Sequence, residues 1–199
     1  MRRQGYRGYQ SDPQGRIQKR RIEMSESAET VKMMLPEEEL DRRIRELGKE
    51  ISEEFAGESV YLIGVLRGAA FFTCELAKRI TIPVTIDFMS TSSYGSGTES
   101  SGEVVVKHDV EIPVEGRNII ICEDIIDSGN TLHFLLKLFR DRKAKTVKLC
   151  AMLDKPDRRE VDVKVDYTGF TIPDEFVVGY GLDYDQKYRN LPYIGVVEF

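Results

Sequence analysis

The 199-residue chain has no tryptophan, only two histidines, and three cysteines that lie far apart in the sequence. Because His108 and His133 both fall outside the predicted loops, a histidine-based metal centre and a Ser-His-Asp triad are disfavoured. The three cysteines are expected to be small buried hydrophobic side chains in a reducing compartment, which favours a cytoplasmic location.

Two other absences narrow the class of protein. No apolar run is long enough for a membrane-spanning helix, and the arginine-rich start lacks the apolar core of a signal peptide, so no membrane partner is expected. The chain has no G-x-x-x-x-G-K-[ST] motif, and the glycines at 95, 97 and 102 do not fit G-x-G-x-x-G. These absences argue against a P-loop hydrolase and against a Rossmann dehydrogenase.

The net charge of −5 is unevenly distributed along the chain. Residues 1–21 hold seven Arg or Lys against one acid, Asp12, a local charge of +6, so the remainder carries −11. This opening is poor in apolar residues, which is typical of disorder, and we predict that residues 1–27 form a disordered basic extension. Its basic residues could contact RNA, but a solvated extension is the favoured interpretation and no nucleic-acid partner is expected. Residues 28–199 are predicted to form one folded domain.

Stretches typical of strands alternate with stretches typical of helices in the rest of the chain. Strands are predicted at 60–66, 82–89, 104–106, 119–122, 146–153, 176–180 and 193–197, and helices begin near 36, 70 and 131. Residues 90–102, almost all Ser, Thr, Gly, Tyr and Glu, are predicted to be a long mobile loop. The alternation predicts an α/β fold with a central parallel twisted sheet flanked by helices, whose ligands bind at the carboxyl ends of the strands.

The most informative stretch is residues 119–131, in which an apolar strand is followed by two carboxylates, a polar loop and a helix. Loop amides and a helix N-terminus together favour an anion. Glu123 and Asp124 would repel a bare phosphate, unless the ligand also presents hydroxyls or a divalent cation. The stretch therefore predicts a phosphorylated sugar bound with Mg²⁺.

The segment Glu-Asp-Ile-Ile-Asp-Ser-Gly-Asn-Thr at 123–131 resembles the phosphoribosyl-diphosphate signature of the type I phosphoribosyltransferases. Residues 62–69, 87–95, 176–184 and 188–192 resemble segments of the hypoxanthine-guanine phosphoribosyltransferases, in order along the chain. This resemblance implies the type I fold for residues 28–199, with a small hood subdomain built from the N- and C-terminal segments. It implies Mg²⁺-dependent transfer of phosphoribosyl from 5-phosphoribosyl 1-diphosphate to hypoxanthine or guanine, in a homodimer or homotetramer.

The resemblance also implies roles for individual residues. Glu123 and Asp124 would hold the ribose hydroxyls and Mg²⁺, with Asp183 as a further metal-site residue. The 5′-phosphate would lie in the loop formed by Asp127, Ser128, Gly129, Asn130 and Thr131. The diphosphate would face Arg67, Gly68 and Arg189, with a cis peptide before Arg67 where relatives commonly have Lys. The purine would meet Lys155, Phe176, Val177 and Asp183, beneath a flexible flap that contains Ser93 and Tyr94.

Three alternatives remain open at this stage. Asp127 is the candidate general base for the purine N7 proton, or else an anchor that accepts a hydrogen bond. The fold could serve a regulatory sensor of phosphoribosyl diphosphate, although a sensor needs neither Asp127 nor Lys155 to activate a purine. The acceptor could be another base, such as xanthine or a pyrimidine, and Lys155 with Phe176 opposes the pyrimidine.

Overall fold

The computed structural model of the chain describes residues 6–11, 17–22, 30–93 and 104–198, with the backbone alone for 6–11, 17–22 and residue 93. Residues 1–30 with 198–199 form one compact unit, and residues 31–197 form another. In the first unit, β1 (Tyr6–Ser11) pairs antiparallel with β2 (Ile17–Ile22), so that Tyr6 lies opposite Ile22. The sequence predicted no regular structure here, but a backbone hydrogen-bond ladder does not require an apolar core.

The second unit is built on a six-stranded sheet with the order β6-β5-β4-β7-β8-β9. Its strands are β4 (Val60–Leu66), β5 (Val84–Ser93), β6 (Val104–His108), β7 (Asn118–Ile126), β8 (Thr146–Asp154) and β9 (Tyr167–Thr171). All neighbours are parallel except β6, which runs antiparallel to β5 at the edge. The predicted parallel sheet is thus mostly confirmed. The exception arises because residues 94–103 are too few for the crossover of about a dozen residues that a parallel neighbour needs.

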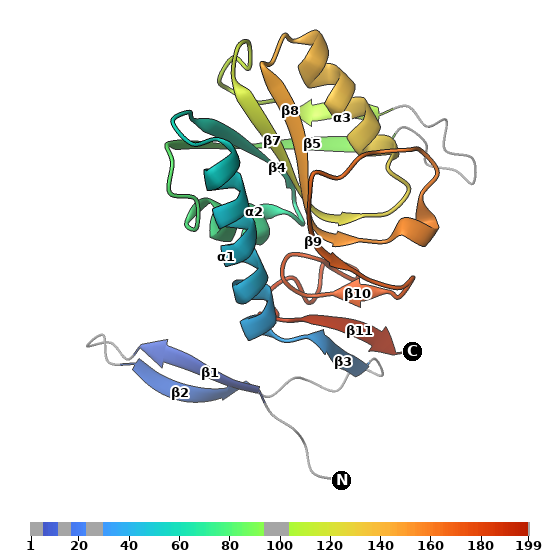
Figure 1. Ribbon diagram of the computed structural model, residues 1–199. Helices are drawn as coiled ribbons and strands as arrows, with labels where there is room; N and C mark the ends of the chain where they lie inside the picture. Colours follow the sequence, from blue (N-terminus) through green and yellow to red (C-terminus); the bar gives the residue numbers. More distant parts are fainter. Residues whose placement is uncertain (1–5, 12–16, 23–29, 94–103, 199) are drawn as a thin grey trace. The chain divides into compact units, whose positions relative to one another are not determined.

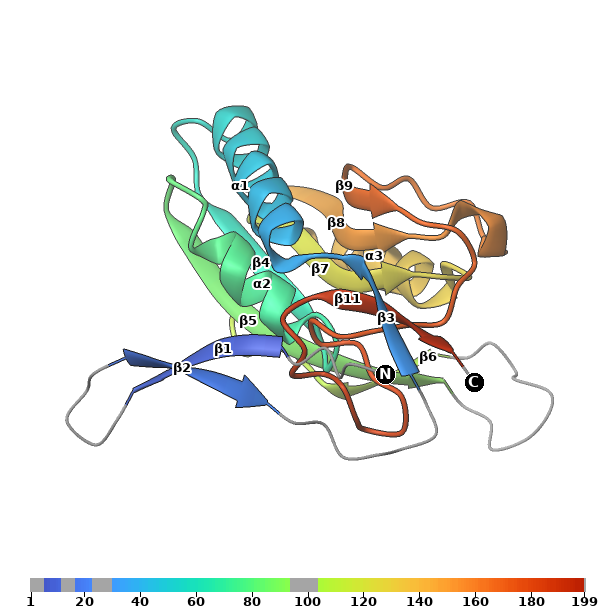
Figure 2. The same ribbon diagram turned by 90° about the horizontal axis from the view of Figure 1, so that it is seen from below.

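Helices cover both faces of this sheet (Figures 1 and 2). Helix α1 (Glu37–Glu54) and helix α2 (Ala70–Ala77) bury one face, and α3 (Asn130–Asp141) buries the other. The helices use apolar residues at helical spacing, among them Leu40, Ile44, Leu47 and Ile51 of α1 and Leu132, Leu135, Leu136 and Phe139 of α3. Within the described part of the chain, no helix combines the length and apolar character needed to cross a membrane.

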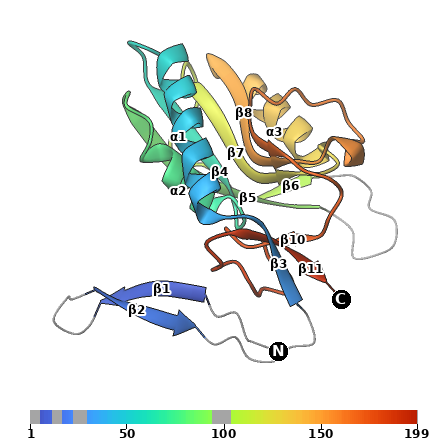
Figure 3. The same ribbon diagram turned by 60° about the horizontal axis from the view of Figure 1, so that its bottom comes forward.

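A second, three-stranded sheet is made from both ends of the chain (Figure 3). It has the order β10-β11-β3, with β3 (Thr30–Leu35), β10 (Val177–Val178) and β11 (Ile194–Glu198). The predicted hood of N- and C-terminal segments is confirmed. The strand expected at 176–180 is shorter, because Gly179 and Tyr180 take φ values of 96° and 51° and turn the chain.

Other strands also differ from the prediction, and β3 was not predicted at all. β5 continues through Ser90–Ser93, which the sequence assigned to a loop, because these polar residues pair with β6. β7 extends to Ile126, so Glu123 and Asp124 lie inside the strand and not after it. β9 was missed altogether, since it is an edge strand with a mixed polar and apolar sequence that pairs with β8 alone.

Candidate active site

The carboxyl ends of the central parallel strands bring three of the predicted loops together. Gly64 of β4 lies opposite Cys122 of β7, which lies opposite Cys150 of β8. The loops that follow these strands therefore open at the same edge of the sheet. They hold Arg67 and Gly68 after β4, residues 127–129 after β7, and Lys155 with the 3₁₀ turn η1 (Pro156–Arg158) after β8.

The loop after β4 lies between the carboxylate of Asp124 and the chain at Gly181. The Leu66–Arg67 peptide bond is cis, as the resemblance implied. A β-carbon built on Gly68 would stand 1.5 Å from Oδ2 of Asp124, and one built on Gly181 would stand 2.0 Å from the carbonyl oxygen of Gly68. Glycine is therefore required at both positions for the three segments to approach one another.

Glu123 and Asp124 are partly buried carboxylates at the centre of this edge. Oε2 of Glu123 is buried with no hydrogen-bond partner among the described residues. Burial and the neighbouring charge of Asp124 raise the pKa of Glu123 well above its usual value. Burial is also the main cause that raises the pKa of Asp124 to about 6, although the amide of Ile125 and the charge of Arg189 oppose it. Such an unsatisfied buried acceptor fits a ligand that brings donors or a cation.

Asp183 and Arg189 form an ion pair on the Asp124 side of the site. Nη2 of Arg189 lies 2.6 Å from Oδ1 of Asp183, and Nη1 of Arg189 donates to the carbonyl of Gly181 at 2.6 Å. Gln186, which the sequence did not single out, bridges this pair to Arg67. Its backbone N–H donates to Oδ2 of Asp183 at 2.8 Å, and its Oε1 accepts from Nη1 of Arg67 at 3.1 Å.

The residues predicted to bind metal do not form a site in which the protein alone supplies the ligands. In residues 30–93 and 104–198, no group of three or more His, Cys, Asp or Glu side chains is placed to hold a metal ion. Mg²⁺, however, commonly takes one or two carboxylates and completes its shell with water and substrate oxygens. The unsatisfied Oε2 of Glu123 and the adjacent Asp124 fit an ion of that kind, held together with a substrate.

The loop after β7 leads directly into α3 and has the form of an anion site. Gly129 is the residue before the helix, with a φ of 88°, a conformation that favours glycine. The carbonyl of Ser128 accepts from the amides of Glu160 and Val161 at 2.9 and 3.1 Å. Nδ2 of Asn130 donates to Oε2 of Glu160 at 2.8 Å and to Oγ of Ser128 at 3.3 Å. Residues after η1 thus fix the shape of the loop, and the N–H groups at the start of α3, including that of Thr131, have no carbonyl partner within the helix, an arrangement that favours an anion.

Lys155 and Phe176 lie on the side of η1 and β10. Lys155 is buried, and its Nζ donates to the carbonyl of Glu175 at 2.6 Å and lies 3.5 Å from Oδ1 of Asp174. Phe176 is 48% exposed and stands edge-on to Tyr184, with ring centroids 5.6 Å apart and an interplanar angle of 86°. Val177, the next residue, is buried. An exposed aromatic ring beside a buried lysine is a plausible surface for a flat heterocycle.

Asp127 contacts two arginines that the sequence did not identify as site residues. Nε of Arg158 donates to Oδ1 of Asp127 at 3.0 Å, and Nη1 of Arg159 donates to its carbonyl at 3.1 Å. Arg159 also forms an ion pair with Asp154 at the end of β8. The charged composition of residues 154–160 was the only sequence signal for these two arginines. A sequence does not show which way a side chain points, so their contacts with Asp127 could not be predicted.

Of the two predicted flap residues, the structure describes only the backbone of Ser93. The backbone of Ser93 pairs with Val104 at the end of the β5–β6 pair. Tyr94 lies outside the described residues. The flap therefore stays a prediction.

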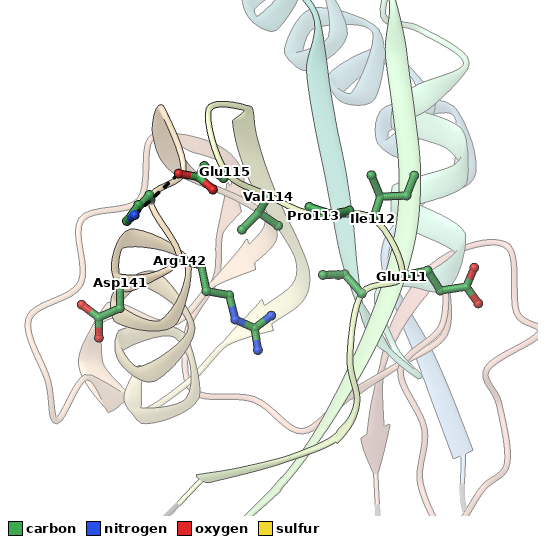
Figure 4. Close-up of a pocket in the computed structure, with 9 residues that line it drawn as sticks. Glu111, Ile112, Pro113, Val114, Glu115, Asp141 and Arg142 are labelled. Atoms are coloured by element: carbon green, nitrogen blue, oxygen red, sulfur yellow. Dashed lines mark ion pairs between the residues drawn. The ribbon is translucent and has the colours of Figure 1, made fainter.

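Two hollows occur elsewhere on the second unit. One, of about 440 Å³, lies at the amino end of β7, opposite the site, between residues 110–115 and the end of α3 (Figure 4). The dashed line in Figure 4 marks its ion pair, Lys143 with Glu115, at 3.7 Å. The other, of about 570 Å³, adjoins the site because Arg189 is among its lining residues. Its remaining walls include Glu37, Asp41, Phe71 and Tyr180.

The model of the protein family described as "Phosphoribosyl transferase domain" matches residues 30–185 of this chain. The hypoxanthine-guanine phosphoribosyltransferase of Bacillus subtilis is 52% identical over 167 residues, which are 84% of this chain and 93% of that protein. The hypoxanthine phosphoribosyltransferase of Salmonella typhimurium is 48% identical over 170 residues, 84% of this chain and 96% of that protein.

A crystal structure of a hypoxanthine-guanine phosphoribosyltransferase from Bacillus anthracis superposes with a TM-score of 0.81 at 48% identity, and covers 84% of this chain and 99% of that one. The chain also matches the bifunctional TilS/HprT protein of Listeria monocytogenes at 52% identity, but spans only 26% of its length. Because several relatives are covered almost completely at about half identity, the chain belongs to the hypoxanthine-guanine phosphoribosyltransferase family.

Proposed function

We propose that the chain is a purine-salvage enzyme that joins hypoxanthine or guanine to 5-phosphoribosyl 1-diphosphate and releases IMP or GMP with diphosphate. One observation carries the proposal. A partly buried carboxylate pair, Glu123 and Asp124, an anion-binding loop before α3 and a buried lysine, Lys155, open at the same edge of one sheet. These features suit a ribose, a phosphate and an oxopurine in turn.

Binding of the donor substrate would use backbone and carboxylate groups. The 5′-phosphate would accept hydrogen bonds from the amides and hydroxyls of residues 127–131, with Gly129 allowing close approach. The ribose hydroxyls would donate to Glu123 and Asp124, which satisfies the buried Oε2 of Glu123. Asn130 stands where relatives often have Lys or Arg. Its Nδ2 is already bonded to Glu160, so this phosphate site would rely on backbone dipoles more than on a side-chain charge.

The leaving diphosphate would lie against the loop after β4. Its amide groups and the guanidinium groups of Arg67 and Arg189 would neutralise the charge that develops as the ribose C1–oxygen bond breaks. Glu123, Asp124 and Asp183 would hold Mg²⁺ together with substrate oxygens, and when bound the ion would add charge neutralisation at the diphosphate. Loss of activity on chelation, restored by added Mg²⁺, tests this part.

The purine would be held by Lys155 at O6, by stacking on Phe176 and by the backbone of Val177, with Asp183 nearby. N9 attacks C1 of the ribose, the electron pair of the C1–oxygen bond leaves with the diphosphate, and Asp127 accepts or shares the proton of N7. Closure of the flap at Ser93 and Tyr94 would exclude water from the positive charge that develops at C1. A lysine that donates to O6 favours 6-oxopurines over adenine.

We also propose a cytoplasmic location and a homodimer or homotetramer. The location is supported by three cysteines without a disulfide, two of them buried. The oligomer follows from the family resemblance, and light scattering of the purified chain tests it. We propose that residues 1–27 form an extension apart from the catalytic domain at 28–199, with no membrane or nucleic-acid partner.

A steady-state assay with phosphoribosyl diphosphate, Mg²⁺ and a series of bases tests the substrate class. Hypoxanthine and guanine are expected to be turned over, whereas adenine, uracil and cytosine are not. The rate with xanthine, which carries an oxygen at C2, measures how the site contacts the purine C2 position. Turnover confined to adenine or a pyrimidine would contradict the role proposed for Lys155.

A further inference from the structure

Four charged groups in the purine part of the site form a chain. Oδ1 of Asp127 accepts from Nε of Arg158 at 3.0 Å, and Nη1 of Arg158 lies 3.7 Å from Oδ2 of Asp174. The other oxygen of Asp174, Oδ1, lies 3.5 Å from Nζ of Lys155. Arg158 therefore stands between the residue proposed to meet N7 and the residue proposed to meet O6, and it contacts one directly and the other through Asp174.

We propose that Arg158 is a positioning residue for the purine, which orients the Asp127 carboxylate and competes with Lys155 for the carboxylate of Asp174. The proposal rests on the transferase function proposed above. It assigns a role in the reaction to a residue that would not itself touch the reacting atoms.

The contact with Asp127 leaves that carboxylate able to serve the purine. A carboxylate has two oxygens with about four acceptor positions. Arg158 approaches Oδ1 through Nε, and no contact to Oδ2 of Asp127 is present among the described side chains. The ion pair thus fixes the rotation of the carboxylate while one oxygen stays available for the N7 proton, as a third group orients the base of a catalytic triad.

The contact with Arg158 also restrains Asp174, which competes with the purine for the N–H donors of Lys155. Nζ of Lys155 has three donors, one of which goes to the carbonyl of Glu175 at 2.6 Å, and a second makes a long hydrogen bond of 3.5 Å to Oδ1 of Asp174. Asp174 divides its two oxygens between Lys155 and Arg158, and both separations exceed an ordinary charged hydrogen bond. Without Arg158, Asp174 would be free to move closer to Lys155 and hold more tightly a donor that the purine O6 needs.

Arg158 is placed by a short segment that is itself tied to the phosphate loop. It is the last residue of η1, and the next two residues, Arg159 and Glu160, bond to the carbonyls of Asp127 and Ser128. A purely structural role would therefore disturb the phosphate loop together with the purine contacts. A positioning role would affect the purine alone, and the two roles can be separated by measuring both substrates.

The test compares Arg158→Gln with the wild-type chain in steady-state assays in which each substrate is varied in turn. We expect the KM for hypoxanthine to rise roughly fivefold, the limit for an exposed ion pair, with the KM for phosphoribosyl diphosphate within about twofold of wild type. Arg158→Lys keeps the charge and should restore part of the loss. Arg42→Gln is the matched control. It removes an exposed pair with Glu46 on α1, with side chains 61% and 44% exposed against 54% and 49% for Arg158 and Asp127.

Asp174→Asn completes the experiment. If Arg158 acts partly through Asp174, the double variant should bind hypoxanthine better than Arg158→Gln alone, because the competitor for Lys155 is gone. An unchanged KM for hypoxanthine in Arg158→Gln, or equal rises in both KM values, would overturn the proposal while the transferase function stands. No turnover by the wild-type chain would overturn both.

Discussion

The carboxylate of Asp124 lies directly over the α-carbon of Gly68, so close that a β-carbon there would stand 1.5 Å from Oδ2. This contact joins the β7 carboxylates to the loop after β4, two segments proposed to hold the ribose and the diphosphate of phosphoribosyl diphosphate. Because Gly68 has no side chain, the ribose and diphosphate parts of the site can lie this close together.

Gly68→Ala is expected to lower kcat/KM for phosphoribosyl diphosphate by roughly a hundredfold, the scale for a displacement of about 1 Å in an active site. The methyl group must push Asp124 or the loop away. Gly57→Ala is the control, because Gly57 has a φ of 80° but no atom within 4 Å of the added carbon. It should cost about 1–2 kcal/mol of stability from backbone strain and leave kcat/KM unchanged. Equal kcat/KM values in the two variants would contradict the proposed contact.

Asp124→Asn is expected to stabilise the ligand-free protein at neutral pH. Because burial raises the pKa of Asp124 from an ordinary 3.8 to about 6, the folded state binds more protons than the unfolded state between these values, and stability falls as pH rises through them. Asparagine does not titrate, and its oxygen can still accept from the amide of Ile125. The variant should therefore match wild type near pH 3.8 and exceed it above pH 6, by about 3 kcal/mol at most.

Urea unfolding at pH 4 and pH 8 measures this difference. Asp109→Asn is a control of opposite sign, because a hydrogen bond from Arg142 lowers the pKa of Asp109. Its loss should destabilise the protein at both pH 8 and pH 4, because this contribution disappears only when pH falls below the ordinary pKa of 3.8. A stability difference for Asp124→Asn that does not vary with pH would show that its charge is not desolvated in the folded protein.

Asp127→Asn is expected to lower kcat far more than it weakens binding of phosphoribosyl diphosphate, by roughly a hundredfold or more if Asp127 acts as a general base. The phosphate loop is built largely from backbone groups, which the substitution keeps. Single-turnover rates together with the Kd for phosphoribosyl diphosphate separate the two effects. Comparable losses in rate and binding would favour the anchor role.

Removal of residues 1–21 is expected to leave kcat and both KM values within about twofold of wild type. The truncated segment carries the basic residues, β1 and all of β2 except Ile22, and belongs to a compact unit separate from residues 31–197. Side-by-side assays of the full and shortened chains measure the effect. A large loss of activity would refute the interpretation of this segment as a solvated extension.

The sequence located the strands that face buried partners on both sides, since continuous apolar runs such as 119–122 have few alternatives. It did not find β3, β9 or the last residues of β5, which are polar or mixed and depend on one neighbouring strand. Pairing with a neighbour is a tertiary property, and local composition does not encode it.

The same distinction holds within the site. Glu123, Asp124 and Lys155 could be named because each matches a motif, and the structure places them at one edge of the sheet. Arg158 and Gln186 could not, because their roles depend on which way an exposed side chain turns. The exposure of Phe176 was also not predictable, since a phenylalanine beside a strand is more often part of a core.

The most direct test of the account is the conversion of hypoxanthine by the purified 199-residue chain with phosphoribosyl diphosphate and Mg²⁺, followed by chromatography of the nucleotide and an assay of released diphosphate. The account predicts IMP and diphosphate in equal amounts, with GMP formed when guanine replaces hypoxanthine. Absence of any nucleotide product with either base would contradict it.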